Sequence, residues 1–284
     1  MIEYDNKHWF RFLFKRSGYH FDGIFFSLLI YGSLVAVLTV AHNSSNIGIF
    51  HIPASFHTVL GLVIGLLLVF RTNTAYERWW EGRKQLGALV NTIRNLAMKF
   101  KTYSEHVDAD TFQLIAAFPW ALKENLRGKD YSTAASHIPA SLLSSFEKAE
   151  HKPNFILVQL SKKAVELHRK NHIQGEQLLI LENKISELTD ILGACERIKN
   201  TPIPFGYAIH LKRILLVYLL SLPFAFIDAI GWWSVPVSMT IFYTMVGIEL
   251  IAEEIEDPFG TDENDLPVDE LEAKMRANIK EIQG

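Results

Sequence analysis

Carboxylate side chains are concentrated in one stretch near the end of the chain, residues 253–265, with the sequence EEIEDPFGTDEND. Carboxylate oxygens are the ligands that Ca²⁺ prefers, and Gly260 suits the tight turn of such a site. The order does not match an EF-hand, because Phe259 stands at the third position counted from Asp257 and Val268 at the twelfth. The stretch therefore has two interpretations, a calcium site or an acidic exit from a membrane helix, and its chemistry alone favours the second.

No catalytic motif accompanies these carboxylates. The sequence contains no Walker lysine loop, no nucleophile elbow and no His-Glu-x-x-His zinc motif. His168 and His172 are four residues apart, but they have no acidic or cysteine partner at regular spacing, which favours a solvated pair over a metal site. The single cysteine, Cys195, excludes an intrachain disulfide, and the net charge of −3 argues against a nucleic-acid partner. We therefore expect a protein that is not an enzyme.

The elements that position the acidic stretch are apolar runs long enough to cross a bilayer, given about 20 residues per crossing. They predict transmembrane helices 1 and 2 within residues 21–70 and transmembrane helices 3 and 4 within residues 213–252. Residues 1–20 mix aromatic and basic side chains, which is typical of an amphipathic segment along the membrane face. Residues 71–212 predict a cytosolic helical domain, and residues 253–284 an acidic cytosolic C-terminal segment. The expected fold is an all-α membrane protein.

The expected cytosolic domain shows apolar residues at helical spacing rather than an alternating strand pattern. Its predicted helices cover residues Gln85–Tyr103, Asp110–Leu126, Pro139–Lys148, Pro153–Lys170 and Glu176–Lys199.

Positive charge predicts the topology. Phe70–Gly87, FRTNTAYERWWEGRKQLG, places Arg, Lys, Trp and Tyr directly after the second apolar run, as at a cytoplasmic membrane boundary. Neither residues 42–52 nor residues 231–236 contain Lys or Arg. We therefore expect a multi-pass protein of the cell inner (plasma) membrane with both termini in the cytoplasm.

The second apolar run has two distinct faces. Gly61 and Gly65 form a small-xxx-small pair that lets helices approach closely. Since two residues turn a helix by about 200°, Ser55, Val59 and Val63 lie roughly opposite the glycines. One side is thus suited to packing, while the other presents short, mostly apolar side chains to something else.

Three segments together resemble the bestrophin family, in particular its bacterial branch. They are Phe70–Gly87, Glu196–Leu215 (ERIKNTPIPFGYAIHLKRIL) and Asp257-Pro258-Phe259-Gly260, and the resemblance covers nearly the whole chain in the right order. It implies an ion channel that assembles as a homo-pentamer in the lipid bilayer around one central pore.

The resemblance also implies roles for particular residues. The apolar pore neck of the family falls on Ser55, Val59 and Val63, although the neck side chains of relatives are larger and include Phe. A second constriction at the cytosolic end of the pore falls on Ile173. Apolar rings gate by wetting and dewetting rather than by binding ions tightly.

Animal bestrophins bind calcium at the acidic segment, whereas bacterial members need not be gated by it. The long acidic run of the animal proteins is interrupted here by Thr261 and Asn264. We therefore expect no required cofactor and treat calcium as a hypothesis. The candidate calcium ligands that the resemblance implies are Glu254, Asp257, Asp262 and Asp265.

The resemblance leaves the conducted ion open. Bacterial relatives pass small monovalent cations such as sodium, which favours a cation channel, and the alternative is a chloride channel of the animal type. A secondary transporter is a further alternative, but such proteins usually contain internal repeats, and the two pairs of apolar runs share no similarity. The last alternative is a membrane scaffold that holds a partner through its helical domain.

Overall fold

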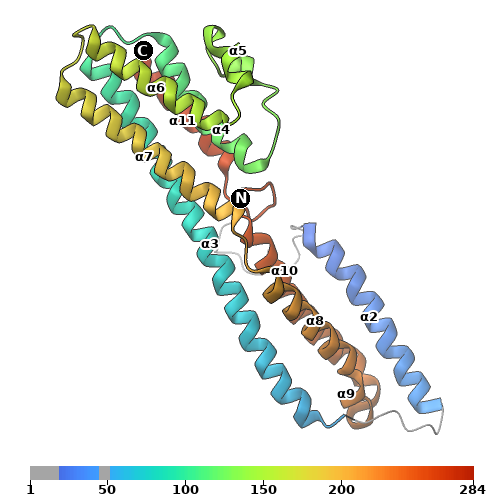
Figure 1. Cartoon of the computed structure of the whole chain (residues 1–284). Helices are drawn as coiled ribbons and strands as arrows, with labels where there is room; N and C mark the ends of the chain where they lie inside the picture. Colours follow the sequence, from blue (N-terminus) through green and yellow to red (C-terminus); the bar gives the residue numbers. More distant parts are fainter. Residues whose placement is uncertain (1–18, 45–51) are drawn as a thin grey trace. The chain divides into compact units, whose positions relative to one another are not determined.

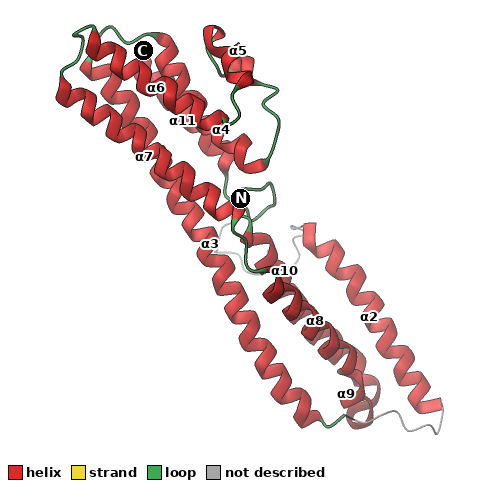
Figure 2. Ribbon diagram, viewed as in Figure 1, coloured by secondary structure: helices red, strands yellow, loops and turns green. Residues whose placement is uncertain are grey.

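The computed structural model describes residues 19–44 and 52–284, with side chains from residue 23 onward. Helices and the loops between them are the only elements within these ranges, and no strand is present there (Figure 2). This confirms the predicted helical fold. The predicted amphipathic segment at residues 1–20 lies almost entirely outside the described residues.

The chain divides into two compact units. Unit 1 comprises Met1–Trp79 and Pro202–Asp265, and unit 2 comprises Trp80–Thr201 and Leu266–Gly284. Each unit therefore combines segments that are far apart in the sequence.

Unit 1 contains the apolar helices. Among the described residues, three stretches are long and apolar enough to cross a membrane: Gly23–Ser44, Ala54–Tyr103 and the longer stretch Gly175–Glu256. The elements that belong to unit 1 are α2 (Tyr19–Ser44), the first part of α3 (Ala54–Tyr103), α8 (Phe205–Ser221), α9 (Pro223–Ile230), η2 (Gly231–Trp233) and α10 (Ser234–Glu256) (Figure 1).

The third apolar run, Ile214–Ile230, predicts a single transmembrane helix 3, but the structure divides this region into α8 and α9. Pro223 begins α9, and because it has no N–H it interrupts the ladder of helical hydrogen bonds. Gly231 ends α9 with φ 54°, a left-handed conformation that glycine adopts without a steric penalty.

The core of unit 1 joins three helices. Ile64 and Leu68 of α3 pack into one buried cluster with Tyr31 and Val35 of α2 and with the inner face of α8. The Tyr31 hydroxyl also donates a hydrogen bond of 2.7 Å to the carbonyl of Leu219. The buried α8 side of this cluster consists of Leu211, Leu215, Tyr218 and Leu219.

Helix α3 is the longest element, with 50 residues, so it extends about 75 Å at 1.5 Å per residue. It contains no proline, and the predicted helix Gln85–Tyr103 is its second half rather than a separate helix. One helix thus carries the predicted neck residues, the boundary segment Phe70–Gly87 and part of the core of unit 2.

Unit 2 is a bundle of helices. They are the second part of α3, α4 (Ala109–Arg127), η1 (Ala134–Ser136), α5 (Ala140–Lys148), α6 (Lys152–Arg169), α7 (Gly175–Asn200) and α11 (Val268–Gln283). Four of its helices, α4 to α7, agree with the predicted ones to within about two residues, whereas η1 and α11 were not predicted as helices.

Local sequence fixes the ends of these helices. The Asp108 side chain accepts a hydrogen bond from the backbone N–H of Thr111 and caps α4. Gln174 and Gln177 form a reciprocal capping box at the start of α7. The inner face of α7 includes Cys195, which is fully buried, and burial raises the pKa of its thiol to about 12.

Candidate functional site

The predicted neck residues lie on a side of α3 that the single chain leaves uncovered. Ser55 is exposed, and Val59 and Val63 are 65% and 49% exposed. On the other side, Ile64 and Leu68 are buried in the core of unit 1. The helical period therefore separates a packed face of α3 from an exposed apolar face.

Gly61 and Gly65 of α3 differ in their surroundings. A Cβ atom on Gly61 would lie 2.8 Å from the Tyr218 hydroxyl, so a larger residue at this position would require the Tyr218 side chain to shift. A Cβ atom on Gly65 would meet nothing within 4 Å. Gly65 instead lines a mostly apolar cavity of about 440 Å³ in unit 1, together with residues of α10 such as Met245.

Ile173 lies in the turn between α6 and α7, and its side chain is only 3% exposed. Its carbonyl is 3.1 Å from Nδ1 of His168, which donates a hydrogen bond in the matching tautomer. Asn171 adopts φ 58° in the same turn, a conformation that Asn tolerates better than most residues. The single chain therefore holds Ile173 in a buried, hydrogen-bonded turn.

A buried charge cluster joins α3 to α10, and sequence reasoning did not find it. Arg71 is 1% exposed, and its guanidinium lies 2.7 Å from the Glu256 carboxylate and 3.7 Å from that of Glu249. Glu249 is also buried. Arg71 belongs to the boundary segment Phe70–Gly87 and Glu249 to α10, and only the fold brings them together.

Further hydrogen bonds attach the end of α10 and the acidic segment to the rest of unit 1. The Arg78 Nε donates to the carbonyl of Glu256 at 3.1 Å, and the indole N–H of Trp79 donates to the carbonyl of Asn264 at 2.9 Å. The Glu256 carboxylate also accepts from the backbone N–H of Ile203 at 2.8 Å. Residues of the boundary segment thus hold the acidic segment in place.

Asp265 is the most buried of the candidate calcium ligands. One carboxylate oxygen accepts a hydrogen bond from the backbone N–H of Asp262 at 2.7 Å, and the other, Oδ1, is buried without a hydrogen-bond partner in the described chain. Burial, followed by the nearby charges of Asp262 and Asp257, raises the pKa of Asp265 to about 6. An unpaired buried oxygen of this kind is suited to a cation.

The remaining candidate calcium ligands do not gather around one point. The Glu254 carboxylate accepts a hydrogen bond from the backbone N–H of Asn264 at 3.2 Å, which orders the loop. Within residues 19–44 and 52–284, no group of three or more His, Cys, Asp or Glu side chains is arranged to hold a metal ion. The segment thus offers Asp265 as one ready ligand rather than an assembled carboxylate site.

The histidines that the sequence singled out do not form a pair on one helix. Helix α6 ends at Arg169, so His168 belongs to it and His172 does not. The His172 ring instead contacts the His106 ring, edge to face, with centroids 4.0 Å apart. The Asp228 carboxylate of α9 lies 2.9 Å from Nε2 of His42.

Comparison with known proteins gives a consistent result. The family described as "Bacterial/Fungal Bestrophin protein" matches residues 1–281. A voltage-dependent anion channel-forming protein of Nostoc sp. is 35% identical over 97% of this chain and 92% of its own length. Its counterpart in Synechocystis sp. is 39% identical over 82% of this chain and 78% of its own.

The solved structures agree with this family match. A bacterial bestrophin homologue from Klebsiella pneumoniae superposes with a TM-score of 0.87 at 28% identity, over 92% of this chain and 99% of that one. The fold, the exposed face of α3 and the whole-chain match therefore lead to one conclusion: the chain belongs to the bacterial and fungal bestrophin family.

Proposed function

We propose that the chain forms a homo-pentameric channel that conducts small monovalent anions through one central pore. The observation that carries this proposal is the exposed apolar face of α3, with Val59 and Val63 at its centre. An exposed apolar face on a helix of membrane-spanning length can contact lipid, a neighbouring subunit or a narrow pore that dewets. The short side chains of this face suit the third case, because they would form the apolar ring of a pore neck.

The names of the relatives support a negative charge for the conducted ion. Those of Nostoc and Synechocystis are both named as anion channel-forming proteins, which favours the chloride alternative over the cation preference expected from the sequence. We therefore propose chloride as the main conducted ion, with Ser55, Val59 and Val63 at the neck.

The test is the reversal potential of purified protein in planar bilayers under a NaCl gradient. We expect a shift toward the chloride equilibrium potential. A shift toward the sodium potential would overturn the proposed ion. An intact assembly that passes no current, both in the native form and with Val59 and Val63 replaced by Ala, would overturn the channel itself.

The neck is tested by Val59→Ala and Val63→Ala, which widen an apolar ring and should raise single-channel conductance by at least about twofold. Val217→Ala is the matched control, because Val217 is 64% exposed but lies on α8. Conductance that is unchanged in both neck variants, or raised equally in the control, would remove these residues from the neck.

The oligomeric state and the second constriction are separate parts of the proposal. Native mass spectrometry should detect five copies of the chain, and another number would contradict the pentamer. The constriction at Ile173 rests on the family resemblance, because the single chain buries this side chain. Ile173→Ala should alter ion selectivity, and a change in stability alone would assign Ile173 to the core.

Calcium regulation is an independent hypothesis, and its support is the unpaired oxygen of Asp265. We expect Asp262→Ala and Asp265→Ala to weaken calcium binding, measured by isothermal titration calorimetry. If neither variant changes calcium affinity or current, the acidic segment is only the exit from α10.

A further inference from the structure

Unit 2 contains a cavity of about 330 Å³ that is lined mainly by residues of α4 and α11. Its floor is apolar and is formed by Phe112, Ala116 and Ala117 of α4 and by Ile279 of α11. Ligand pockets have volumes of about 300–1,000 Å³ and are lined by apolar groups with a few polar ones, so the cavity is large enough for a small molecule.

The charged groups at the rim of this cavity are all basic. Arg276 and Lys280 of α11 line it, and none of its lining residues is Asp or Glu. Within the described residues, the Lys280 ammonium has no hydrogen-bond or ion-pair partner. The rim therefore carries a positive charge that the protein does not neutralise.

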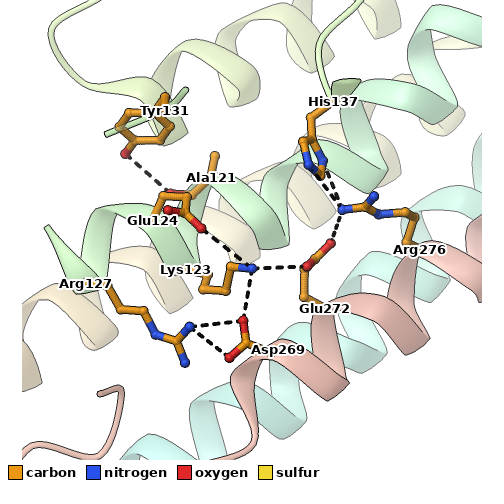
Figure 3. Close-up of polar contacts among 9 residues, drawn as sticks. All are labelled: Ala121, Lys123, Glu124, Arg127, Tyr131, His137, Asp269, Glu272 and Arg276. Atoms are coloured by element: carbon orange, nitrogen blue, oxygen red, sulfur yellow. Dashed lines mark hydrogen bonds and ion pairs between the residues drawn. The ribbon is translucent and has the colours of Figure 1, made fainter. Parts of the chain in front are cut away.

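The carboxylates on the adjoining part of α11, Glu272 and Asp269, are already paired with cations (Figure 3). Glu272 accepts from Arg276 and lies 3.3 Å from the Lys123 ammonium. Asp269 lies 3.1 Å from Lys123 and 2.8 Å from Arg127. Two cations besides Arg276 thus share these two acids, so the acids do not neutralise Lys280.

Contacts with Glu272 and His137 fix the position of the Arg276 guanidinium and leave some of its N–H donors unused within the described chain. One of its terminal nitrogens donates to Glu272 and also to Nδ1 of His137 at 3.0 Å. The His137 ring is stacked on Trp120, with centroids 4.3 Å apart and an interplanar angle of 3°. Burial, together with the charge of Arg276, lowers the pKa of His137 to about 4, so at neutral pH the ring is an uncharged acceptor.

We propose that this cavity binds a small organic anion, whose carboxylate contacts Lys280 and Arg276 and whose apolar body lies on the Phe112 and Ile279 floor. A charge-assisted hydrogen bond to a carboxylate is the favoured use of such donors. The neighbouring cavity near His106 lacks this excess charge, because its lysines, Lys163 and Lys170, are paired with Asp108 and Glu166.

The test is equilibrium dialysis of radiolabelled benzoate against the full-length protein in lipid nanodiscs, with empty nanodiscs as the blank. We expect saturable binding that Lys280→Glu weakens at least about tenfold, because it replaces the attractive charge with a repulsive one. Ala116→Leu, which fills the floor, should weaken binding similarly without lowering the unfolding temperature. Benzylamine, the cationic analogue, should not compete.

Lys274→Glu is the matched control, because it makes the same change of charge on the same helix. Lys274 is exposed and does not line the cavity. Its binding of benzoate should equal that of the native protein. The proposal is overturned if benzoate shows no saturable binding above the blank, if both lysine variants lose binding equally, or if Ala116→Leu binds as the native protein does.

Discussion

The Arg71 guanidinium lies 2.7 Å from the Glu256 carboxylate, and this ion pair joins the middle of α3 to the last turn of α10. Glu249, about two turns earlier on α10, faces the same guanidinium from 3.7 Å. Charges buried in a membrane protein are expensive unless they are paired. The pair therefore connects the helix that carries the predicted neck to the start of the acidic segment.

Replacing Arg71 with Met should destabilise unit 1 strongly. The change leaves Glu249 buried without a cation, a situation that typically costs about 3–5 kcal/mol. We expect a large fall in the unfolding temperature measured by scanning fluorimetry. Adding Glu249→Gln and Glu256→Gln to Arg71→Met should recover much of the loss. If the single variant unfolds like the native protein, the buried pair contributes nothing to stability.

Gly61 and Gly65 of α3 should respond oppositely to alanine. Gly61→Ala places a methyl group against the Tyr218 hydroxyl, and overpacking of this kind costs about 1–3 kcal/mol. Gly65→Ala meets no neighbour and should stabilise the helix by up to about 1 kcal/mol. Unfolding temperatures of both variants, and of Gly61→Ala with Tyr218→Phe, provide the measurement. Equal effects at both positions would contradict the close approach at Gly61.

Asp265 should make stability depend on pH. Its pKa is raised to about 6, so between about pH 4 and 6 the folded protein binds a proton that the unfolded chain releases. The contribution of Asp265 to stability should therefore fall as pH rises through that range, by about 2–3 kcal/mol. Asp265→Asn should remove this contribution in calcium-free buffer, and an unchanged profile would contradict the assignment.

His137 should act in the opposite direction. Its pKa is lowered to about 4, so between about pH 4 and 6.5 the unfolded chain binds a proton that the folded protein does not. This contribution makes stability rise with pH over the same range. His137→Gln should leave only the contribution of Asp265, so the stability of the variant should fall more steeply than that of the native protein as pH rises toward 6. A profile that matches the native one would exclude His137 as a titrating group.

Helical periodicity made most of this fold predictable. The helices of unit 2 and the exposed face of α3 both follow from the spacing of apolar residues, which local sequence determines. The burial of Ile173 and the pairing of Arg71 with Glu249 were not predictable, because they depend on which distant segments meet. The division of the third apolar run was visible in principle, since Pro223 lies inside it.

The only cysteine of the chain, Cys195, lies in the interior of unit 2 with a thiol pKa of about 12. Only a thiolate reacts readily with maleimides and methanethiosulfonates, so the native protein should be inert to these reagents. A cysteine introduced at Ser55, Val59 or Val63 would then be the sole reactive thiol in each subunit. The natural sequence is therefore already a silent background for mapping, by chemical labelling, which residues water reaches along the ion path.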